Sequence, residues 1–281
     1  MPIKPFRALL TGAAATALLA TPLGAQDMPT APRATYADLV DLSIAAPLVL
    51  RAKIDDQATV ERERAPGLAP GHARLYVEAE TTALIAGNAP IGESLRYLVD
   101  VPLDAKGKVP KLKKREVVLF ARPVAGNARQ VQLVYARAQL PYTPELESRL
   151  RPILTELVDP DRAPVITGVR DALSVEGTLT GESETQLFLD TRDDGPVSVT
   201  IVRRPNQAPR WGVSWSEIVD QSARAPQRET LAWYRMACFL PETLPNDANL
   251  SREMRSREMA ARDYAFMIEQ LGACPRNRTQ G

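Results

Sequence analysis

Lysine is concentrated in one short stretch of the chain. Five of the seven lysines lie between residues 106 and 114, whereas the 28 arginines are spread along the sequence. The cluster consists of Lys106, Lys108, Lys111, Lys113 and Lys114 and is followed by Arg115. Concentrated positive charge attracts anionic partners such as lipid headgroups, an envelope polymer or an acidic protein surface. The same charges also occur on exposed hairpins, where they prevent aggregation of an edge strand.

A second candidate binding group combines arginine with aromatic residues and contains all three tryptophans of the chain. Its members are Arg203, Arg204, Arg210, Trp211, Trp215, Trp233 and Tyr234. Arginine and tryptophan dominate binding hot spots, and Arg203, Arg204, Arg210 and Trp211 are the candidates to contact a ligand. A small core covered by arginine stems has the same composition. Since Trp211, Val213 and Trp215 would share one strand face, we favour the core.

Catalytic motifs are weak. The only histidine, His72, follows a Pro/Gly-rich loop, and a histidine-assisted nucleophile would need serine or cysteine beside it. Ser183 and Ser214 lie in near matches to Gly-x-Ser-x-Gly that lack the final glycine. Carboxylates that could act as acid and base lie at Glu182, Glu184, Asp190, Asp193 and Asp194. We expect a surface loop at His72, strand edges at both serines and a turn at the aspartates.

Composition argues against several classes of function. The chain has 281 residues with 35 basic and 34 acidic side chains, whereas general nucleic-acid binding needs a broadly basic surface. One histidine and two cysteines leave too few ligands for zinc, haem or iron–sulfur sites. We therefore expect no nucleic acid as a partner, no metal and no cofactor.

The first 25 residues have the pattern of a signal peptide. Lys4 and Arg7 precede an uncharged, mostly apolar run over 8–20, and small residues lead up to Gln26. The apolar run is too short to cross a bilayer, which needs about 20 residues. We expect cleavage near Ala25 and a periplasmic or secreted chain without a transmembrane segment.

Cys238 and Cys274 are the only cysteines. An isolated pair in an exported protein predicts one disulfide. Redox-active pairs usually have Cys-x-x-Cys spacing, which this pair lacks. We therefore interpret it as a structural link that holds the last helix.

Hydropathy patterns predict a β-rich first half. A helix is expected over 36–46, where Pro47 stops it. Alternating apolar residues predict strands near 48–55, 75–85, 95–103, 116–121 and 131–140. Five strands resemble the number in an OB-type barrel, but that fold usually carries a helix between its third and fourth strands. Here only the loop over 104–115 is available.

The second half has a mixed pattern. A connecting helix is expected over 144–158, with Pro144 in its first turn and Thr143 as its cap. Strands are expected over 165–175, 184–191, 196–204 and 210–215, and helices over 216–222, 226–240 and 250–271. The predicted fold class is α+β: a five-stranded antiparallel barrel or sandwich, OB-like, followed by a small antiparallel sheet packed with C-terminal helices.

This pattern predicts two domains in an exported chain. The expected divisions are a leader (1–25), a flexible lead-in (26–35), a barrel-like domain (36–142), a linking helix (143–161) and an α+β domain (162–281). The leading hypothesis is a non-enzymatic protein that contacts an anionic partner through residues 106–115. The alternatives are a hydrolase that uses carboxylate or Ser/His groups at the domain junction, and a structural assembly subunit. A fold resemblance alone carries no function.

Overall fold

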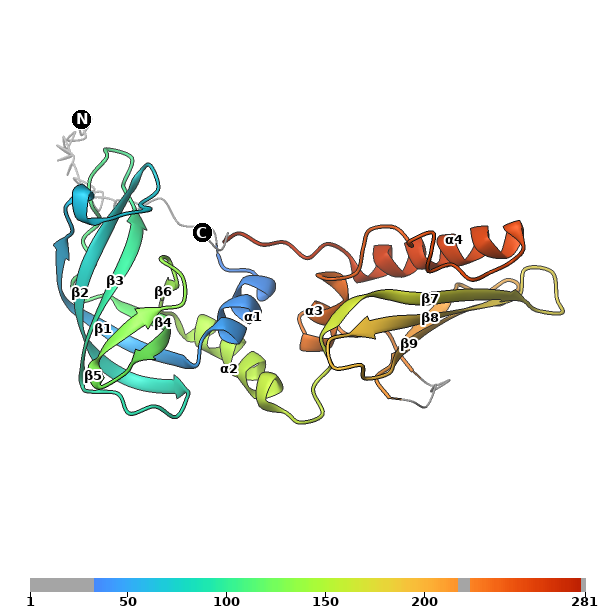
Figure 1. Ribbon diagram of the computed structural model, residues 1–281, viewed down its shortest axis with the longest axis horizontal. Helices are drawn as coiled ribbons and strands as arrows, with labels where there is room; N and C mark the ends of the chain where they lie inside the picture. Colours follow the sequence, from blue (N-terminus) through green and yellow to red (C-terminus); the bar gives the residue numbers. More distant parts are fainter. Residues whose placement is uncertain (1–32, 217–222, 279–281) are drawn as a thin grey trace, which may run out of the picture.

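The computed structural model describes residues 33–216 and 223–278. Two β-sheets lie at opposite ends of the molecule, with helices between them and over the second sheet (Figure 1). The predicted leader (1–25) and, apart from Ser216, the helix expected over 216–222 lie outside the described residues. In the described part of the chain, no helix is both long enough and apolar enough to cross a membrane.

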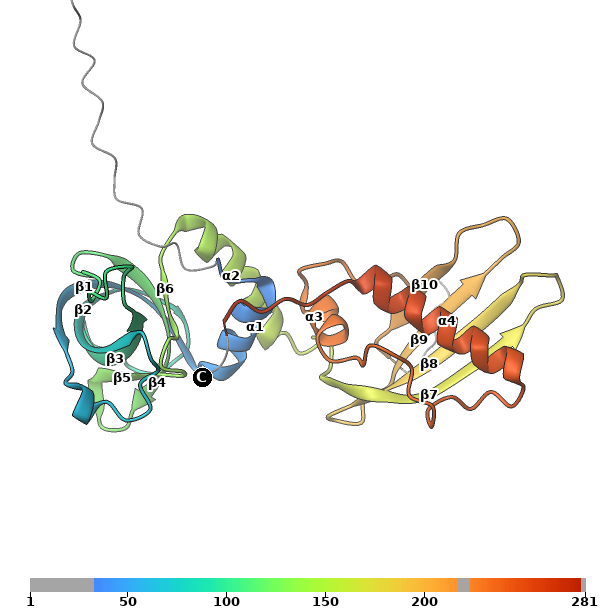
Figure 2. The same ribbon diagram turned by 90° about the horizontal axis from the view of Figure 1, so that it is seen from above.

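The first sheet closes into a barrel. Its strands are β1 (Leu48–Thr59), β2 (His72–Ala86), β3 (Ser94–Pro102), β4 (Glu116–Val124), β5 (Asn127–Leu133) and the short β6 (Gln139–Pro141). Strand β1 pairs with both β2 and β4, and β3 meets β5 in parallel at Arg96 and Gln130. Five strands therefore form a ring in the order β1-β2-β3-β5-β4-β1, seen end-on in Figure 2. This is the strand order of an OB-type barrel, the architecture that the strand count favoured, and β6 adds a short sixth strand beside β4. The β3–β5 contact is parallel, whereas we expected all strands of the barrel to be antiparallel.

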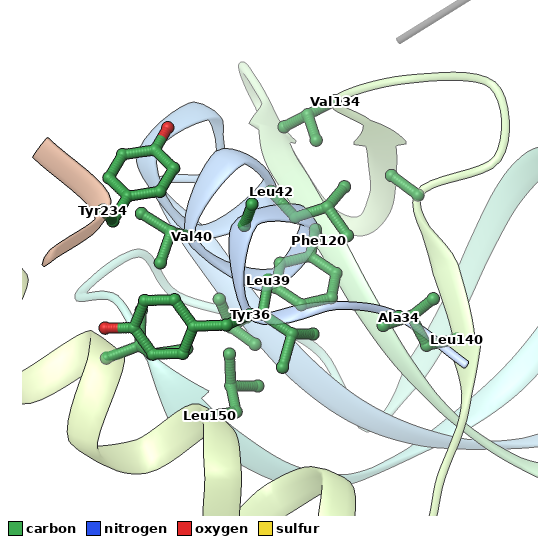
Figure 3. Packing of buried hydrophobic residues seen from close by; sticks show 14 of the residues in the cluster. Ala34, Tyr36, Leu39, Val40, Leu42, Phe120, Val134, Leu140, Leu150 and Tyr234 are labelled. Atoms are coloured by element: carbon green, nitrogen blue, oxygen red, sulfur yellow. The ribbon is translucent and has the colours of Figure 1, made fainter. Parts of the chain in front are cut away.

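A helix before the barrel covers it. Helix α1 (Tyr36–Ala45) begins at Thr35, whose hydroxyl accepts from the Asp38 amide while the Asp38 carboxylate accepts from the Thr35 amide. Leu39 and Val40 are fully buried, and Figure 3 shows Leu39 beside Phe120 of β4. The helix that covers the apolar side chains of this barrel therefore precedes β1 in the chain and does not lie between β3 and β4.

Helix α2 (Pro144–Val158) leads out of the barrel with the predicted bounds. The Thr143 hydroxyl accepts from the Leu146 amide at 3.1 Å, and Pro144 occupies the first turn. Buried apolar residues form one cluster that continues from the barrel through α1 and α2 to the second sheet. The division into separate domains stays a prediction.

The second sheet is antiparallel with the order β10-β9-β8-β7. Its strands are β7 (Ile166–Glu176), β8 (Ser183–Thr191), β9 (Val197–Arg203) and β10 (Arg210–Ser214). Helix α4 (Met254–Leu271) lies across one face, and α3 (Leu231–Ala237) lies at the end nearest the barrel (Figure 2). The predicted α+β class, with a barrel followed by a small sheet and C-terminal helices, is confirmed.

Both C-terminal helices are shorter than predicted. Helix α3 begins only after Thr230, whose hydroxyl caps the Trp233 amide at 3.2 Å. The residues before α4 run beside β7, where the Leu250 amide donates to the Ala172 carbonyl at 2.9 Å. Leu250 is therefore 55% exposed instead of packing on the sheet as part of the helix, and Met254, the first residue of α4, is 77% exposed.

The buried face of α4 contains a carboxylate that an apolar pattern does not predict. Asp263 is fully buried and accepts from the guanidinium of Arg203 and the hydroxyl of Thr185. Tyr264 and Met267 lie on the same buried face. The helix thus packs on the sheet through a polar network as well as through apolar contacts.

The segment after α4 returns to the barrel side of the molecule (Figures 1 and 2). The Asp38 carboxylate of α1 accepts from the amides of Asn277 and Arg278, both at 3.1 Å. One turn further along α1, Asp41 accepts from Arg276 Nε at 2.7 Å and from the Tyr234 hydroxyl. The two carboxylates of α1 therefore fasten the C-terminal segment to the barrel.

The predicted disulfide is confirmed. Cys238 at the end of α3 is bonded to Cys274, 36 residues later, with Cα atoms 5.2 Å apart. Cys274 lies two residues before Arg276. The bond thus anchors the C-terminal segment at the point from which it reaches α1.

We predict that Cys238→Ser together with Cys274→Ser lowers the free energy of unfolding by about 3–4 kcal/mol, because a closed loop of this length restricts the unfolded chain. Urea unfolding of the oxidised protein and of the double variant measures the difference. Wild-type protein in reducing buffer is the matched comparison and should unfold at the midpoint of the variant. Equal midpoints for oxidised protein and variant would contradict the prediction.

Candidate anion-binding surface

The lysine cluster lies on the loop between β3 and β4, at one end of the barrel. Loop 103–115 lies beside loop 60–71, and the Leu103 amide donates to the Gly71 carbonyl at 2.8 Å. Figure 1 shows both loops at the upper end of the barrel. The predicted loop without a helix is therefore confirmed as the element that presents the lysines.

Asp104 organises the first half of the loop. Its carboxylate accepts from the amides of Lys106 and Lys108, both at 2.8 Å, and its carbonyl accepts from the Gly107 amide at 2.9 Å. Gly107 has a φ of 72°, which glycine adopts without steric cost. The hydrogen bond from the Lys108 amide is the main cause that lowers the pKa of the Asp104 carboxyl, and the adjacent ammonium groups act in the same direction.

Strand β1 holds the second half. The Gln57 amide group donates to the Pro110 carbonyl at 2.9 Å and accepts from the Leu112 amide at 2.6 Å. The Ile54 carbonyl accepts from the Lys114 amide at 2.7 Å, and the Ile54 amide donates to the carbonyl of the residue that follows Lys114, at 2.9 Å. The backbone of the lysine loop is thus fixed at both ends.

The cationic side chains point outward from this fixed backbone. All six are exposed, while Val109 and Leu112 between them pack against the core. Lys113 lies 3.7 Å from Asp56, and both side chains of this pair are more than half exposed, at 61% and 70%. For the other five cations, no ion pair within 4 Å exists among the described residues. The loop therefore presents an excess of positive charge, of which Asp104 and Asp56 offset only a part.

The neighbouring loop 60–71 contributes little net charge. Its short helical turn (Arg62–Arg64) places two arginines next to Glu61 and Glu63. Arg74 holds this loop by donating to the Pro66 carbonyl at 3.1 Å and to both Asp100 oxygens at 2.7 and 2.9 Å. These hydrogen bonds to Asp100 raise the pKa of the Arg74 guanidinium. The positive potential at this end of the barrel thus comes mainly from residues 106–115.

The arginine and tryptophan group is distributed over several surroundings. Arg203 is bonded to the buried Asp263, whereas Arg204 and Arg210 are exposed at the β9–β10 hairpin. Trp211 is half-buried and packs against the core, as favoured from the alternation. Trp233 lies in α3, away from this hairpin. A binding role for Arg203, Arg204, Arg210 and Trp211 stays a prediction.

The catalytic candidates lie in different parts of the molecule. His72 begins β2 of the barrel, and its Nδ1 lies 3.0 Å from the Pro70 carbonyl oxygen. Ser183 begins β8 of the second sheet and lines a cavity of about 630 Å³ together with Arg255, Glu258 and Arg262, at the β7–β8 turn and not at the domain junction where we expected a hydrolase site. Within residues 33–216 and 223–278, no group of three histidine, cysteine or acidic side chains has a geometry that could hold a metal ion.

Sequence reasoning identified the lysines but not the residues that fix their backbone. Asp104 precedes Lys106 by two positions, which is the spacing of an Asx turn and could have indicated its role. Gln57 lies 53 residues from Pro110 and has no local signal. Its contribution follows only from the pairing of strands.

We predict that Asp104→Ala speeds hydrogen exchange at the amides of Lys106 and Lys108, because both lose their acceptor. Nuclear magnetic resonance or mass spectrometry of the exchanging amides measures this change. Asp104→Asn is the matched control and should keep slow exchange, because its side-chain oxygen still accepts. Equal exchange in all three proteins would show that Asp104 does not order the loop.

No protein-family model matches the chain, and the search of curated proteins found no match.

Proposed function

We propose that the protein is exported and acts as a non-enzymatic binding protein that contacts anionic lipid headgroups through residues 106–115. The signal-peptide pattern over 1–25 and the disulfide between Cys238 and Cys274 support export, since disulfides persist in oxidising compartments. A periplasmic location fits both features.

One observation carries the binding part of this proposal. Six cations project from an ordered backbone, and five of them have no ion pair among the described residues. Holding the backbone in advance reduces the entropy lost when the surface meets a partner. Lysine near an anionic membrane contributes about 1 kcal/mol per residue.

The choice of lysine favours a headgroup surface over a single fixed ligand. Where this protein needs fixed geometry it uses arginine, as in the contacts of Arg74 with Asp100 and of Arg276 with Asp41. Lysine is a mobile point charge that does not demand bidentate geometry. Several mobile charges on one rim suit phosphate groups whose positions vary laterally.

We predict that changing Lys106, Lys108, Lys111, Lys113 and Lys114 to serine lowers affinity for anionic vesicles at least about 100-fold. Co-sedimentation with phosphatidylglycerol-containing vesicles measures binding, and phosphatidylcholine vesicles give the uncharged reference. The same five positions changed to arginine should keep binding, because the charge is retained.

A smaller matched pair separates local from overall charge. Lys106→Ser with Lys108→Ser removes two charges from the loop, whereas Arg122→Ser with Arg129→Ser removes two from exposed barrel positions outside it. Only the lysine pair should weaken vesicle binding. If the native protein does not bind anionic vesicles but binds a soluble acidic protein or polymer, the headgroup proposal is wrong.

A hydrolase is the second candidate, because Ser183 lines a cavity that also contains carboxylates and arginines. If this serine is a nucleophile, Ser183→Ala abolishes hydrolysis of p-nitrophenyl ester probes, whereas Ser148→Ala on α2 leaves it unchanged. Equal rates for the native protein and Ser183→Ala would remove this candidate.

A further inference from the structure

A cavity of about 510 Å³ lies where the barrel side of the molecule meets the second sheet. It is lined by the start of α1, by α2, by the segment before α3, by α3 itself and by Pro275 of the C-terminal segment. The side chains that face it and carry the argument are Arg33, Tyr36, Arg149, Arg228, Glu229 and Trp233. Its volume is typical of sites for small organic molecules, which often lie between packed units.

Positive charge is in excess around this cavity. Arg33, Arg149 and Arg228 contribute three guanidinium groups, and Glu229 is the only carboxylate among the lining residues. Arg149 Nη1 donates to the Ala34 carbonyl at 3.1 Å, which holds it at the start of α1. Within the described residues, none of the three arginines has an ion pair within 4 Å. An anion entering the cavity would therefore meet unneutralised donors.

The start of helix α1 forms another part of the cavity wall. The cavity is lined by residues 34–37, which form the amino-terminal end of this ten-residue helix. Thr35 caps the Asp38 amide and the Asp38 carboxylate accepts from the Thr35 amide, so this helix end is ordered and already carries a carboxylate of its own.

Tyr36 supplies an unused donor. Its side chain is only 7% exposed, and its hydroxyl is buried without a hydrogen-bond partner among the described residues. Figure 3 shows the ring directed away from the barrel strands, on the side where Tyr234 lies. Burial raises the pKa of the Tyr36 hydroxyl, and Glu156 and Glu229 raise it further, so the group keeps its proton at neutral pH. A buried donor without an acceptor is costly unless something else occupies that role.

Trp233 lies at the buried side of the cavity, where 3% of the residue is exposed. Its ring meets Tyr36 edge to face with centroids 6.0 Å apart, and its Nε1 is already bonded to the Leu271 carbonyl at 2.9 Å. The guanidinium of Arg228 lies 5.7 Å from the centre of the same ring. Gly272 makes room for this arginine, because a Cβ there would lie 2.6 Å from Arg228 Nη1. The guanidinium of Arg228 thus lies over the ring of this apolar residue.

We propose that this cavity binds a small molecule with a flat apolar body and one carboxylate. The body packs on Trp233 and Pro275, and the carboxylate accepts from the arginines and from the Tyr36 hydroxyl near the start of α1. This site is separate from the lysine loop, so it does not depend on the proposed function.

The test uses 2-naphthoate and its neutral counterpart 2-naphthamide in isothermal titration calorimetry. The native protein should bind one naphthoate and bind naphthamide at least about tenfold more weakly, because the amide lacks the charge. Arg149→Gln and Arg228→Gln should each weaken naphthoate binding about tenfold and leave naphthamide unchanged. Arg122→Gln, on the barrel and outside the cavity, should change neither.

Tyr36→Phe distinguishes a ligand-binding role from a structural one. Removing an unpartnered buried hydroxyl should leave the unfolding midpoint equal or higher, while naphthoate affinity falls. The variant with five lysines changed to serine should bind naphthoate like the native protein. Absence of saturable naphthoate binding to the native protein, or equal affinity for the acid and the amide, would overturn the proposal.

Discussion

The arrangement of the molecule depends on two carboxylates on one face of α1. Asp38 accepts hydrogen bonds from the Thr35 amide at the start of its own helix and from two amides of the C-terminal segment. Asp41 accepts from Arg276 and from the Tyr234 hydroxyl. Hydrogen bonds to charged groups contribute about 1.5–3 kcal/mol each, more than neutral ones. Because α1 is also packed into the barrel, these bonds attach the second sheet to the first at a fixed point.

The two proposed sites differ in how firmly the protein holds their side chains. The lysine loop lies at an open end of the barrel, where mobile charges act at a range of about 8–10 Å that salt shortens. The junction cavity lies beside the fixed carboxylates of α1, where Arg149 and Trp233 are held by hydrogen bonds to backbone carbonyls. The first arrangement favours a partner of variable shape, and the second favours a ligand of defined shape.

Local patterns in the sequence predicted most of the elements, because alternation and proline positions act over a few residues. Helix α2 has the predicted bounds, and the strand count indicated the barrel. The buried Asp263 could not be predicted, because its role depends on Arg203, 60 residues away. The junction cavity could likewise not be predicted from the sequence, since Tyr36 and Trp233 come together only through the fold. Lysine spacing located the candidate loop, but Gln57, which fixes it, has no local pattern.

The position of the bonding partners along the chain has a consequence for the order of folding. Asp41 and Arg276 are 235 residues apart, and Asp38 and Arg278 are 240 apart. Ribosomes deliver these partners at widely separated times, and closing so long a loop is entropically unfavourable until the intervening elements are compact. The Asp38 and Asp41 carboxylates therefore stay solvated until the C-terminal segment has been made and can bind them. Docking of the two sheets is then a late event in folding.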